Sequence, residues 1–291
     1  MESERLVVPS YMKEIMEKYQ FRFKRRFGQN FLIDRNILMK IVASAQLNAT
    51  DYVIEIGTGL GSLTTQLAHQ CKQVISFEID RDLVLFLQEN IDQKNIRIVA
   101  GDAMAIDWRA QLVQRGWTDE PVKLVANLPY YLTTPLVMQA LEGNVPFASV
   151  TVMVQQEVAD RMMAKPATKE YGVLSLAVQY YSDPILVAKA PRTVFMPSPD
   201  VDSTVIQLLV KEPVTSVPVK ALFQVIKAAF GQRRKTIKNS LRSLIQAWGI
   251  SGGELDQVLM DLDIAVTCRG EVLSLEQFCD LTQGLLALAG R

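Results

Sequence analysis

The chain has 291 residues, of which 49% are hydrophobic and 21% are charged. This composition is close to that of soluble globular proteins, which excludes a disordered, collagen-like or coiled-coil chain, and the length predicts about two domains. A single histidine, His69, argues against histidine-rich metal sites and histidine-based catalytic triads.

Membrane and redox signals are weak throughout the chain. No apolar run approaches the roughly 18–20 residues that a membrane span needs, and the acidic N-terminus lacks the apolar core of a secretory signal. Cys71, Cys268 and Cys279 form no Cys-x-x-Cys pair, as is typical of reduced thiols. We therefore expect a cytoplasmic protein without a metal ion. Because no long apolar stripe or heptad pattern is visible, we also expect a monomer.

Positive charge is concentrated in two segments, although the formal net charge is zero. Residues 220–242 contain seven cations and no acid. Such local patches bind phosphate polymers whatever the total charge, and solvated helix faces are the alternative. The candidate RNA-binding residues are Arg22, Lys24, Arg25 and Arg26 in the first segment and Arg233, Arg234 and Lys235 in the second.

Short runs rich in β-branched residues alternate with helical patterns from residue 52 to about 155. The runs are nearly all apolar, as strands buried on both faces are. This spacing predicts an α/β fold with a doubly wound, mostly parallel, Rossmann-like sheet. Two later runs could form an antiparallel hairpin at one edge. The runs cover residues 52–56, 73–79, 96–100, 122–127 and 149–154, followed by 185–188 and 204–210.

The pattern changes after Val210. Residues 211–220 contain two prolines and are typical of a linker. Helical periodicity then continues to the end of the chain. We therefore predict an α/β domain over residues 1–211 and a small all-helical domain over residues 212–291.

A glycine-rich turn, EIGTGLG (residues 55–61), follows the first predicted strand. Glycines allow a sharp turn and a close approach by a ligand. A dinucleotide site has the spacing GxGxxG, whereas Gly57, Gly59 and Gly61 give GxGxG with Glu55 two residues ahead of it. This pattern suits S-adenosylmethionine, which carries an amino acid moiety and no phosphate; a tight turn without a ligand is the alternative.

Two carboxylates follow the next strands. Glu78 ends the second run, where an acid can accept both ribose hydroxyls. Its neighbour Asp80 is better explained as a helix N-cap. Asp102, in the pair Gly101-Asp102, can accept a hydrogen bond from an adenine amino group, although such a pair is often only a turn.

The most specific motif is NLPY, with Asn127, Leu128, Pro129 and Tyr130 at the end of the fourth run. Methylation of an exocyclic amine needs the nitrogen lone pair, which in adenine is delocalised into the ring. An asparagine oxygen and a backbone carbonyl held by proline can accept the two N–H bonds and redirect that lone pair. Tyr130 offers a face on which the base stacks, worth roughly 1–3 kcal/mol. The start of a loop is the structural alternative.

Together these motifs resemble those of the class I methyltransferases that act on N6 of adenine. Residues 27–32 (FGQNFL) are similar to the N-terminal motif of the ribosomal RNA adenine N6-dimethyltransferases. Residues 195–203 (FMPSPDVDS) are similar to the FxPxPxVxS loop of the same family. The resemblance covers about residues 20–245.

The resemblance implies dimethylation of two adjacent adenosines near the 3′ end of 16S rRNA, in the 30S subunit or its precursor, with S-adenosylmethionine as donor. It implies that Phe195 stacks on the flipped base opposite Tyr130; plain core packing is the alternative for Phe195. Both basic segments would hold the RNA backbone. The residues expected at the donor are Gln29, Asn30, Leu32, Glu55, Gly57, Gly59, Glu78, Asp102 and Asn127.

Three other functions compete with this one. Large-subunit (23S) rRNA methyltransferases of the resistance type share the same motifs but tend to be more basic, which a pI near 6.6 disfavours. A non-catalytic assembly protein on the same fold is disfavoured by the intact Glu78 and NLPY motif. A nicotinamide-dependent dehydrogenase is disfavoured by the position of the third glycine.

Overall fold

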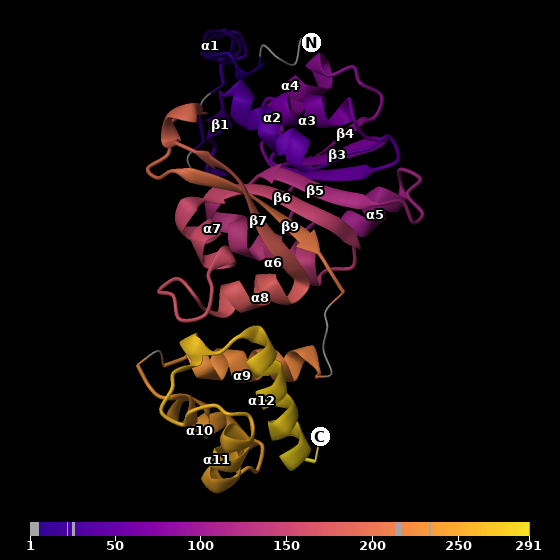
Figure 1. Ribbon diagram of the computed structural model, residues 1–291. Helices are drawn as coiled ribbons and strands as arrows, with labels where there is room; N and C mark the ends of the chain where they lie inside the picture. Colours follow the sequence, from indigo (N-terminus) through magenta and orange to yellow (C-terminus); the bar gives the residue numbers. More distant parts are fainter. Residues whose placement is uncertain (1–5, 22, 25–26, 213–216, 233, 291) are drawn as a thin grey trace. The chain divides into compact units, whose positions relative to one another are not determined.

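The computed structural model describes residues 6–21, 23–24, 27–212, 217–232 and 234–290, and the chain divides into two compact units (Figure 1). The first unit comprises Met1–Ala159 and Ser182–Lys211, and the second comprises Asp160–Tyr181 and Glu212–Arg291. The sequence pattern predicts that all of residues 1–211 belong to the α/β domain. The structure instead groups residues 160–181 with the C-terminal helices.

A seven-stranded sheet with the order β4-β3-β2-β5-β6-β9-β7 forms the centre of the first unit. Strands β2 to β6 run parallel, and β9 runs antiparallel to both β6 and β7. The predicted parallel sheet and its antiparallel edge pair are therefore confirmed. The strands are β2 (Tyr52–Ile56), β3 (Gln73–Glu78), β4 (Ile96–Ala100), β5 (Val122–Asn127), β6 (Phe147–Gln155), β7 (Ser182–Ala190) and β9 (Ser203–Val210).

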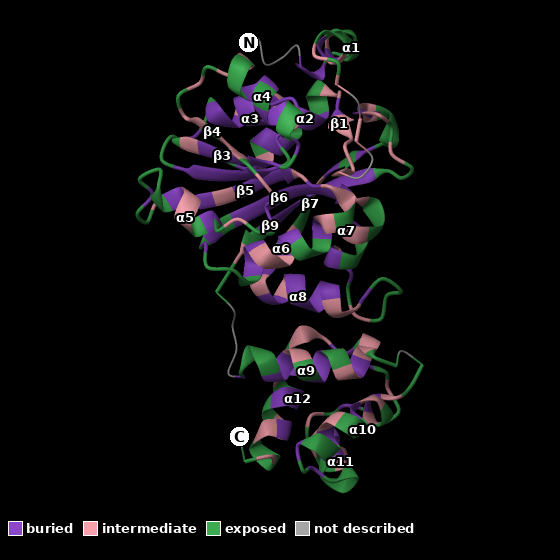
Figure 2. Ribbon diagram, turned by 180° about the vertical axis from the view of Figure 1, so that it is seen from behind, coloured by how far each residue is buried: buried purple, intermediate pink, exposed green. Residues whose placement is uncertain are grey.

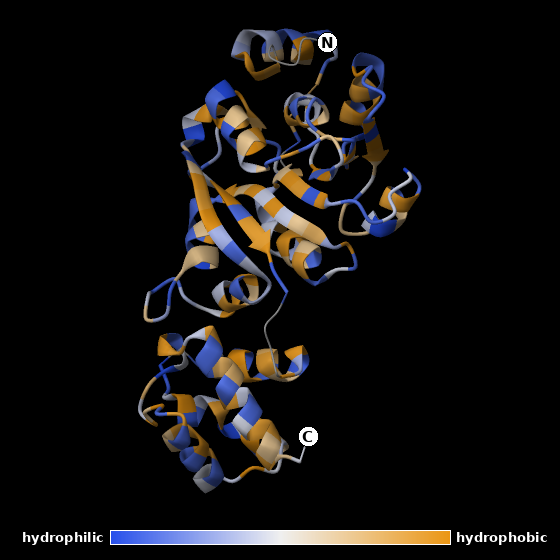
Figure 3. Ribbon diagram, turned by 45° about the vertical axis from the view of Figure 1, so that its right-hand side comes forward, coloured by the Kyte–Doolittle hydropathy of each residue, from blue (hydrophilic) through white to orange (hydrophobic). Residues whose placement is uncertain are grey.

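Helices cover both faces of this sheet, with α2, α3 and α4 on one face and α5 and α6 on the other (Figures 1 and 2). The central strands are largely apolar (Figure 3), and every residue of β2 is buried, as expected for strands covered on both sides. The first-unit helices are α1 (Pro9–Lys18), α2 (Arg35–Ser44), α3 (Ser62–Ala68), α4 (Arg81–Asn90), α5 (Trp108–Val113) and α6 (Thr133–Glu142), with 3-10 turns at Tyr130–Leu132 and Arg192–Val194.

A second, two-stranded sheet pairs β1 (Phe31–Leu32) with β8 (Phe195–Met196). The pairing is antiparallel and joins Leu32 to Phe195. Both of these side chains are buried in the core between the sheet and helices α2 and α3. This small sheet therefore ties the FGQNFL segment, residues 27–32, to the loop before β9.

The second unit is helical and has its own hydrophobic core, to which the connection after α7 contributes. Tyr171 is buried there, and its hydroxyl donates to the carbonyl of Leu273 at 2.9 Å. Ser251 and Ser274 begin helices with capping boxes. The remaining helices are α7 (Gln156–Met163), which crosses the boundary between the units, α8 (Val173–Tyr181), α9 (Val219–Phe230), α10 (Ile237–Ala247), α11 (Gly252–Asp261) and α12 (Leu275–Leu288), with a 3-10 turn at Gly270–Val272.

The length and hydropathy of these helices show whether any of them could cross a membrane. Within the described ranges, no helix is both long enough and apolar enough to cross a membrane.

A buried ion pair fastens the start of β2 to β5. Asp51 is fully buried, and its carboxylate lies 2.9 Å from Lys123 Nζ. Asp51→Ala leaves this ammonium without its counter-charge, so we expect the free energy of unfolding to fall by on the order of 3 kcal/mol. Asp183→Ala, which breaks the exposed pair with Lys211, should cost less than about 1 kcal/mol. Urea denaturation followed by tryptophan fluorescence measures both, and equal losses would contradict the expectation.

Candidate active site

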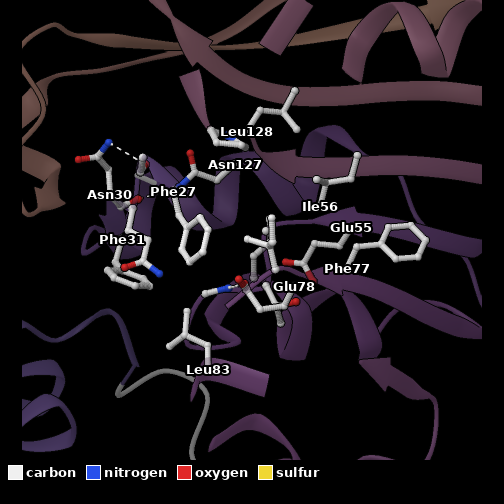
Figure 4. A pocket seen from close by; sticks show the side chains of 18 of the residues that line it. Phe27, Asn30, Phe31, Glu55, Ile56, Phe77, Glu78, Leu83, Asn127 and Leu128 are labelled. Atoms are coloured by element: carbon white, nitrogen blue, oxygen red, sulfur yellow. Dashed lines mark hydrogen bonds between the residues drawn. The ribbon is translucent and has the colours of Figure 1, made fainter. Parts of the chain in front are cut away.

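A pocket of about 1150 Å³, partly open to solvent, lies at the carboxyl ends of β2, β3, β4 and β5 (Figure 4). In open α/β sheets ligands bind at this edge, where the strand order reverses; here β2 lies between β3 and β5. The predicted donor-site residues come together here, all of them lining the pocket: Gln29, Asn30, Leu32, Glu55, Gly57, Gly59, Glu78, Asp102 and Asn127.

The glycine turn between β2 and α3 forms the floor of the pocket. Gly57, Gly59 and Gly61 all have positive φ, at 81°, 58° and 85°, a region that favours glycine. A Cβ on Gly59 would lie 3.2 Å from the ring of Phe31. The turn therefore needs its glycines for backbone conformation and also for the close approach of the FGQNFL segment.

Glu55 is buried beneath this turn. Its Oε2 accepts a hydrogen bond from Ser76 Oγ at 2.7 Å, and Ser76 Oγ is also 2.6 Å from Thr58 Oγ1. Its Oε1 has no hydrogen-bond partner within the described part of the chain. Burial raises the pKa of Glu55 to about 8. The Oε1 atom is shielded from solvent, and the side chains of Thr64 and Ser76 lower the pKa of the carboxyl group against the larger effect of burial.

Glu78 is also buried, at the carboxyl end of β3. Its Oε2 accepts from the backbone N–H of Gly59 at 3.0 Å, and its Oε1 accepts from that of Asp80 at 2.9 Å. Burial raises the pKa of Glu78 to about 6. The predicted N-cap role of Asp80 is confirmed, since its side chain accepts from the N–H of Asp82. Asp102 is exposed and accepts from the N–H of Met104 at 2.9 Å.

Asn127 lies on the opposite side of the pocket, at the end of β5. Its Nδ2 donates to the backbone carbonyl of Asn30 at 3.1 Å. The amide nitrogen is thereby fixed, and no described residue donates to Oδ1. Leu128 is buried, and the carbonyl of Pro129 already accepts from Leu132 N at 3.0 Å. The oxygen of Asn127 is therefore the polar end available to a ligand.

Two tyrosines follow in the 3-10 turn. Tyr130 is half-buried and lines the pocket, with its hydroxyl 2.6 Å from Ser203 Oγ. Burial raises the pKa of Tyr130. Tyr131, which is absent from the residues predicted for the site, also lines the pocket and is 54% exposed. Its position directly after the NLPY motif is the signal that could have identified it.

Phe195 is not on the pocket wall. Its side chain is 3% exposed and packs in the core, opposite Leu32 in the β1–β8 pair. The structure therefore shows the core packing that the sequence left open as the alternative, while the stacking of Phe195 on a base stays a prediction. The reason for this packing is the antiparallel pairing with β1, which turns this ring towards α2 and the sheet.

The predicted RNA-binding residues divide into three groups. Lys24 does not project freely into solvent, because its Nζ lies 2.6 Å from carboxylate oxygens of both Asp80 and Asp82. Arg234 and Lys235 are exposed in the second unit, just before α10. Four further cations fall outside the described residues: Arg22, Arg25, Arg26 and Arg233.

The fold and the pocket together define a class, the Rossmann-like methyltransferases. Residues 20–282 match the family model described as ribosomal RNA adenine dimethylase. The chain belongs to this family, and it is accordingly a methyltransferase whose relatives act on RNA.

Similar proteins agree with this assignment. The chain is 45% identical over 284 residues to ribosomal RNA small subunit methyltransferase A of Clostridioides difficile, and the match covers 96% of each chain. It is 46% identical to the protein of the same name from Bacillus licheniformis, over 96% of this chain and 97% of the relative.

Solved structures share the fold. A dimethyladenosine transferase from Plasmodium falciparum superposes with a TM-score of 0.76 and 24% identity, over 89% of this chain and 98% of that one. The 23S rRNA methyltransferase ErmE has a TM-score of 0.67 and 25% identity, over 88% and 99%.

Because the pKa of Glu55 is raised by burial, we expect the free energy of unfolding to depend on pH. With a pKa of about 8 in the folded chain against an ordinary value of 4.5, the folded state keeps a proton that the unfolded state releases. Stability is therefore lost as the pH rises between these values, by about 1.4 kcal/mol per pH unit for one proton.

Glu55→Gln removes this titration, so the variant should gain stability relative to the original chain from pH 5 to pH 8. Urea denaturation at several pH values measures the difference. The same change at Glu142, which is exposed at the end of α6, is the matched control. Curves for Glu55→Gln and the original chain that stay parallel across the range would contradict the expectation.

Proposed function

We propose that this chain transfers methyl groups from S-adenosylmethionine to N6 of adenosines in small-subunit (16S) rRNA, dimethylating two adjacent adenosines in a 3′-terminal hairpin loop during assembly of the 30S subunit. The observation that carries the proposal is the Asn127 amide, fixed through its nitrogen by the carbonyl of Asn30 in the same pocket as Glu78 and the glycine turn. A ribosomal substrate would place the protein in the cytoplasm.

The pocket residues suit S-adenosylmethionine, which supplies an activated methyl group on a sulfonium centre. Glu78 would accept hydrogen bonds from the ribose hydroxyls of the donor, and Asp102 would accept one from the amino group of the donor's adenine. The carboxyl group of Glu55, which lines the same pocket, suits the donor's ammonium group. Buried acids without a described cationic partner in the pocket favour a cationic ligand, because a positive charge offsets the cost of ionising them.

On the acceptor side, Asn127 Oδ1 would accept a hydrogen bond from one N–H of the amino group on the target adenine of the RNA. The carbonyl of Pro129 is occupied by Leu132, so the carbonyl of Leu128 is the backbone acceptor that we assign to the second N–H bond. These two bonds turn the nitrogen lone pair towards the methyl group. The protein then mainly aligns donor and acceptor, an effect of orientation. Transfer would break the bond between the methyl group and the sulfonium sulfur, leaving the donor as a thioether and the base as a methylated aminium cation. This cation is acidic and would lose its proton to water without a strong general base.

The target base must leave its stack to reach this pocket, which costs a few kcal/mol and least in a loop. Stacking on Tyr130 offsets part of that cost. With Phe195 in the core, Tyr130 is the aromatic face that we assign to the base. We assign Arg234 and Lys235, exposed in the helical unit, to phosphates of the RNA backbone, where cations position the substrate without reading its sequence.

The similarities favour small-subunit RNA over the alternatives. Relatives named for the small subunit are about 45% identical over 96% of the chain, whereas ErmE, named for 23S rRNA, is 25% identical over 88%. The intact Asn127, Glu78 and Tyr130 in one pocket speak against a non-catalytic assembly protein.

Transfer of tritiated methyl groups from S-adenosylmethionine to ribosomal particles that lack this modification tests the proposal. We expect label in 30S particles, recovered as N6,N6-dimethyladenosine, and none in unmodified 50S particles assayed in parallel. Label in 50S particles alone would support the large-subunit alternative. Binding of S-adenosylmethionine without label in either particle would contradict the assigned substrate.

A further inference from the structure

Two residues of the N-terminal stretch bind one buried carboxylate, that of Asp80. Lys24 Nζ donates to Asp80 Oδ1 at 2.6 Å, and Gln29 Nε2 donates to Asp80 Oδ2 at 2.8 Å. Gln29 Oε1 in turn accepts from the backbone N–H of Lys24 at 2.8 Å. The Asp80 side chain is 4% exposed, and the ammonium of Lys24 also reaches Asp82. These three residues, Lys24, Gln29 and Asp80, form a closed set of contacts that we call the latch.

The latch is joined directly to the donor side of the pocket. The backbone N–H of Asp80 donates to Glu78, and Glu78 also accepts from Gly59 in the glycine turn. Asp80 additionally caps α4. The N-terminal stretch is therefore fastened to the same strand end that presents Glu78.

The residue after Gln29 is anchored on the other side of the pocket. The carbonyl of Asn30 accepts from Asn127 Nδ2, and the ring of Phe31 lies against Gly59. Successive residues of the FGQNFL segment thus connect the end of β3, through Asp80, with the end of β5, through Asn127. Figure 4 shows Asn30 and Phe31 beside the pocket, across from Glu55 and Glu78.

We propose that Lys24 and Gln29 are positioning residues, which hold the FGQNFL segment as a wall of the methyl-donor pocket by binding Asp80. The expectation that Lys24 holds an RNA phosphate is replaced, because its ammonium is committed to Asp80 and Asp82. The inference rests on the proposed use of S-adenosylmethionine. Loss of the latch loosens the segment at Gln29, so the donor is held less tightly while Asn127 and Glu78 are unchanged.

The charge of Lys24 is central to this role. Asp80 and Asp82 stand close together at the start of α4, with Glu78 two residues before Asp80, and an ammonium between the first two offsets their mutual repulsion. Because Asp80 is buried, its pair with Lys24 is screened less than a pair at the surface. An arginine at position 24 keeps the charge, whereas a methionine keeps only the length of the side chain.

Isothermal titration of the full-length chain with S-adenosylmethionine tests the latch. For Lys24→Met we expect donor affinity roughly tenfold weaker, with KM for the donor raised in step and kcat at saturating donor within about threefold of the original. Lys24→Arg should restore most of the affinity. Gln29→Leu, which removes no charge, should also weaken donor binding.

Lys72→Met is the matched control, since Lys72 pairs with Glu120 in the same unit away from the pocket, and it should bind the donor as the original chain does. Unchanged donor affinity in Lys24→Met, with weaker binding of an rRNA hairpin, would overturn the latch and would assign Lys24 to RNA binding instead. An original chain that binds no S-adenosylmethionine would instead overturn the proposed function on which the latch rests.

Discussion

The hydrogen bond between Asn127 Nδ2 and the carbonyl of Asn30 is the interaction on which the pocket depends. It joins the end of β5 to a segment almost 100 residues earlier in the chain. An asparagine amide can present either its oxygen or its nitrogen, and a carbonyl partner accepts only from the nitrogen. The position of the Asn30 backbone therefore decides which end of the side chain faces a ligand. Every contact that fixes residues 27–32 therefore also fixes the orientation of the Asn127 amide.

Two buried carboxyl groups determine the electrostatics of the pocket. Glu55 and Glu78 are both buried, and burial raises the pKa of each. Hydrogen bonds from Ser76 to Glu55 and from backbone N–H groups to Glu78 offset part of the cost. A protein that needed these acids only for folding would be more stable with neutral side chains there. Their retention under a glycine turn is understandable for a site that receives a positively charged donor.

Local physics made much of this predictable from the sequence. Strands buried on both faces have no polar alternation, so β2, β3, β5 and β6 were recognisable as apolar runs between helical patterns. The edge strand β4 is only partly buried and was recognisable from its β-branched residues and spacing. Gly57 and Gly59 were recognisable from their GxGxG spacing after a predicted strand. The structure adds that both have positive φ and that Phe31 approaches Gly59 closely. Glu78, Asp102 and Asn127 were found because parallel strands end at one edge, which brings their last residues together.

Long-range pairing limited the rest. Phe195 pairs with β1 across more than 160 residues, and that partner, rather than its own motif, decides that its ring is buried. Lys24 appeared as one of four clustered cations, and only the fold brings it to Asp80 and Asp82. Residues 160–181 precede two strands of the sheet, yet they pack with the C-terminal helices through contacts such as that of Tyr171 with Leu273.

Asn127→Asp tests the central claim most directly, because aspartate keeps an acceptor oxygen but loses the N–H that binds the Asn30 carbonyl. The variant is measured with the original chain in the same methyl-transfer assay at saturating S-adenosylmethionine, so that a change in donor affinity does not enter the rate. Its rate of transfer should fall by on the order of 100-fold, the scale expected when an aligned polar group is lost from a reacting centre. Transfer at nearly the original rate would contradict the account, since it would show that the oxygen alone suffices and that the bond to Asn30 does not orient it.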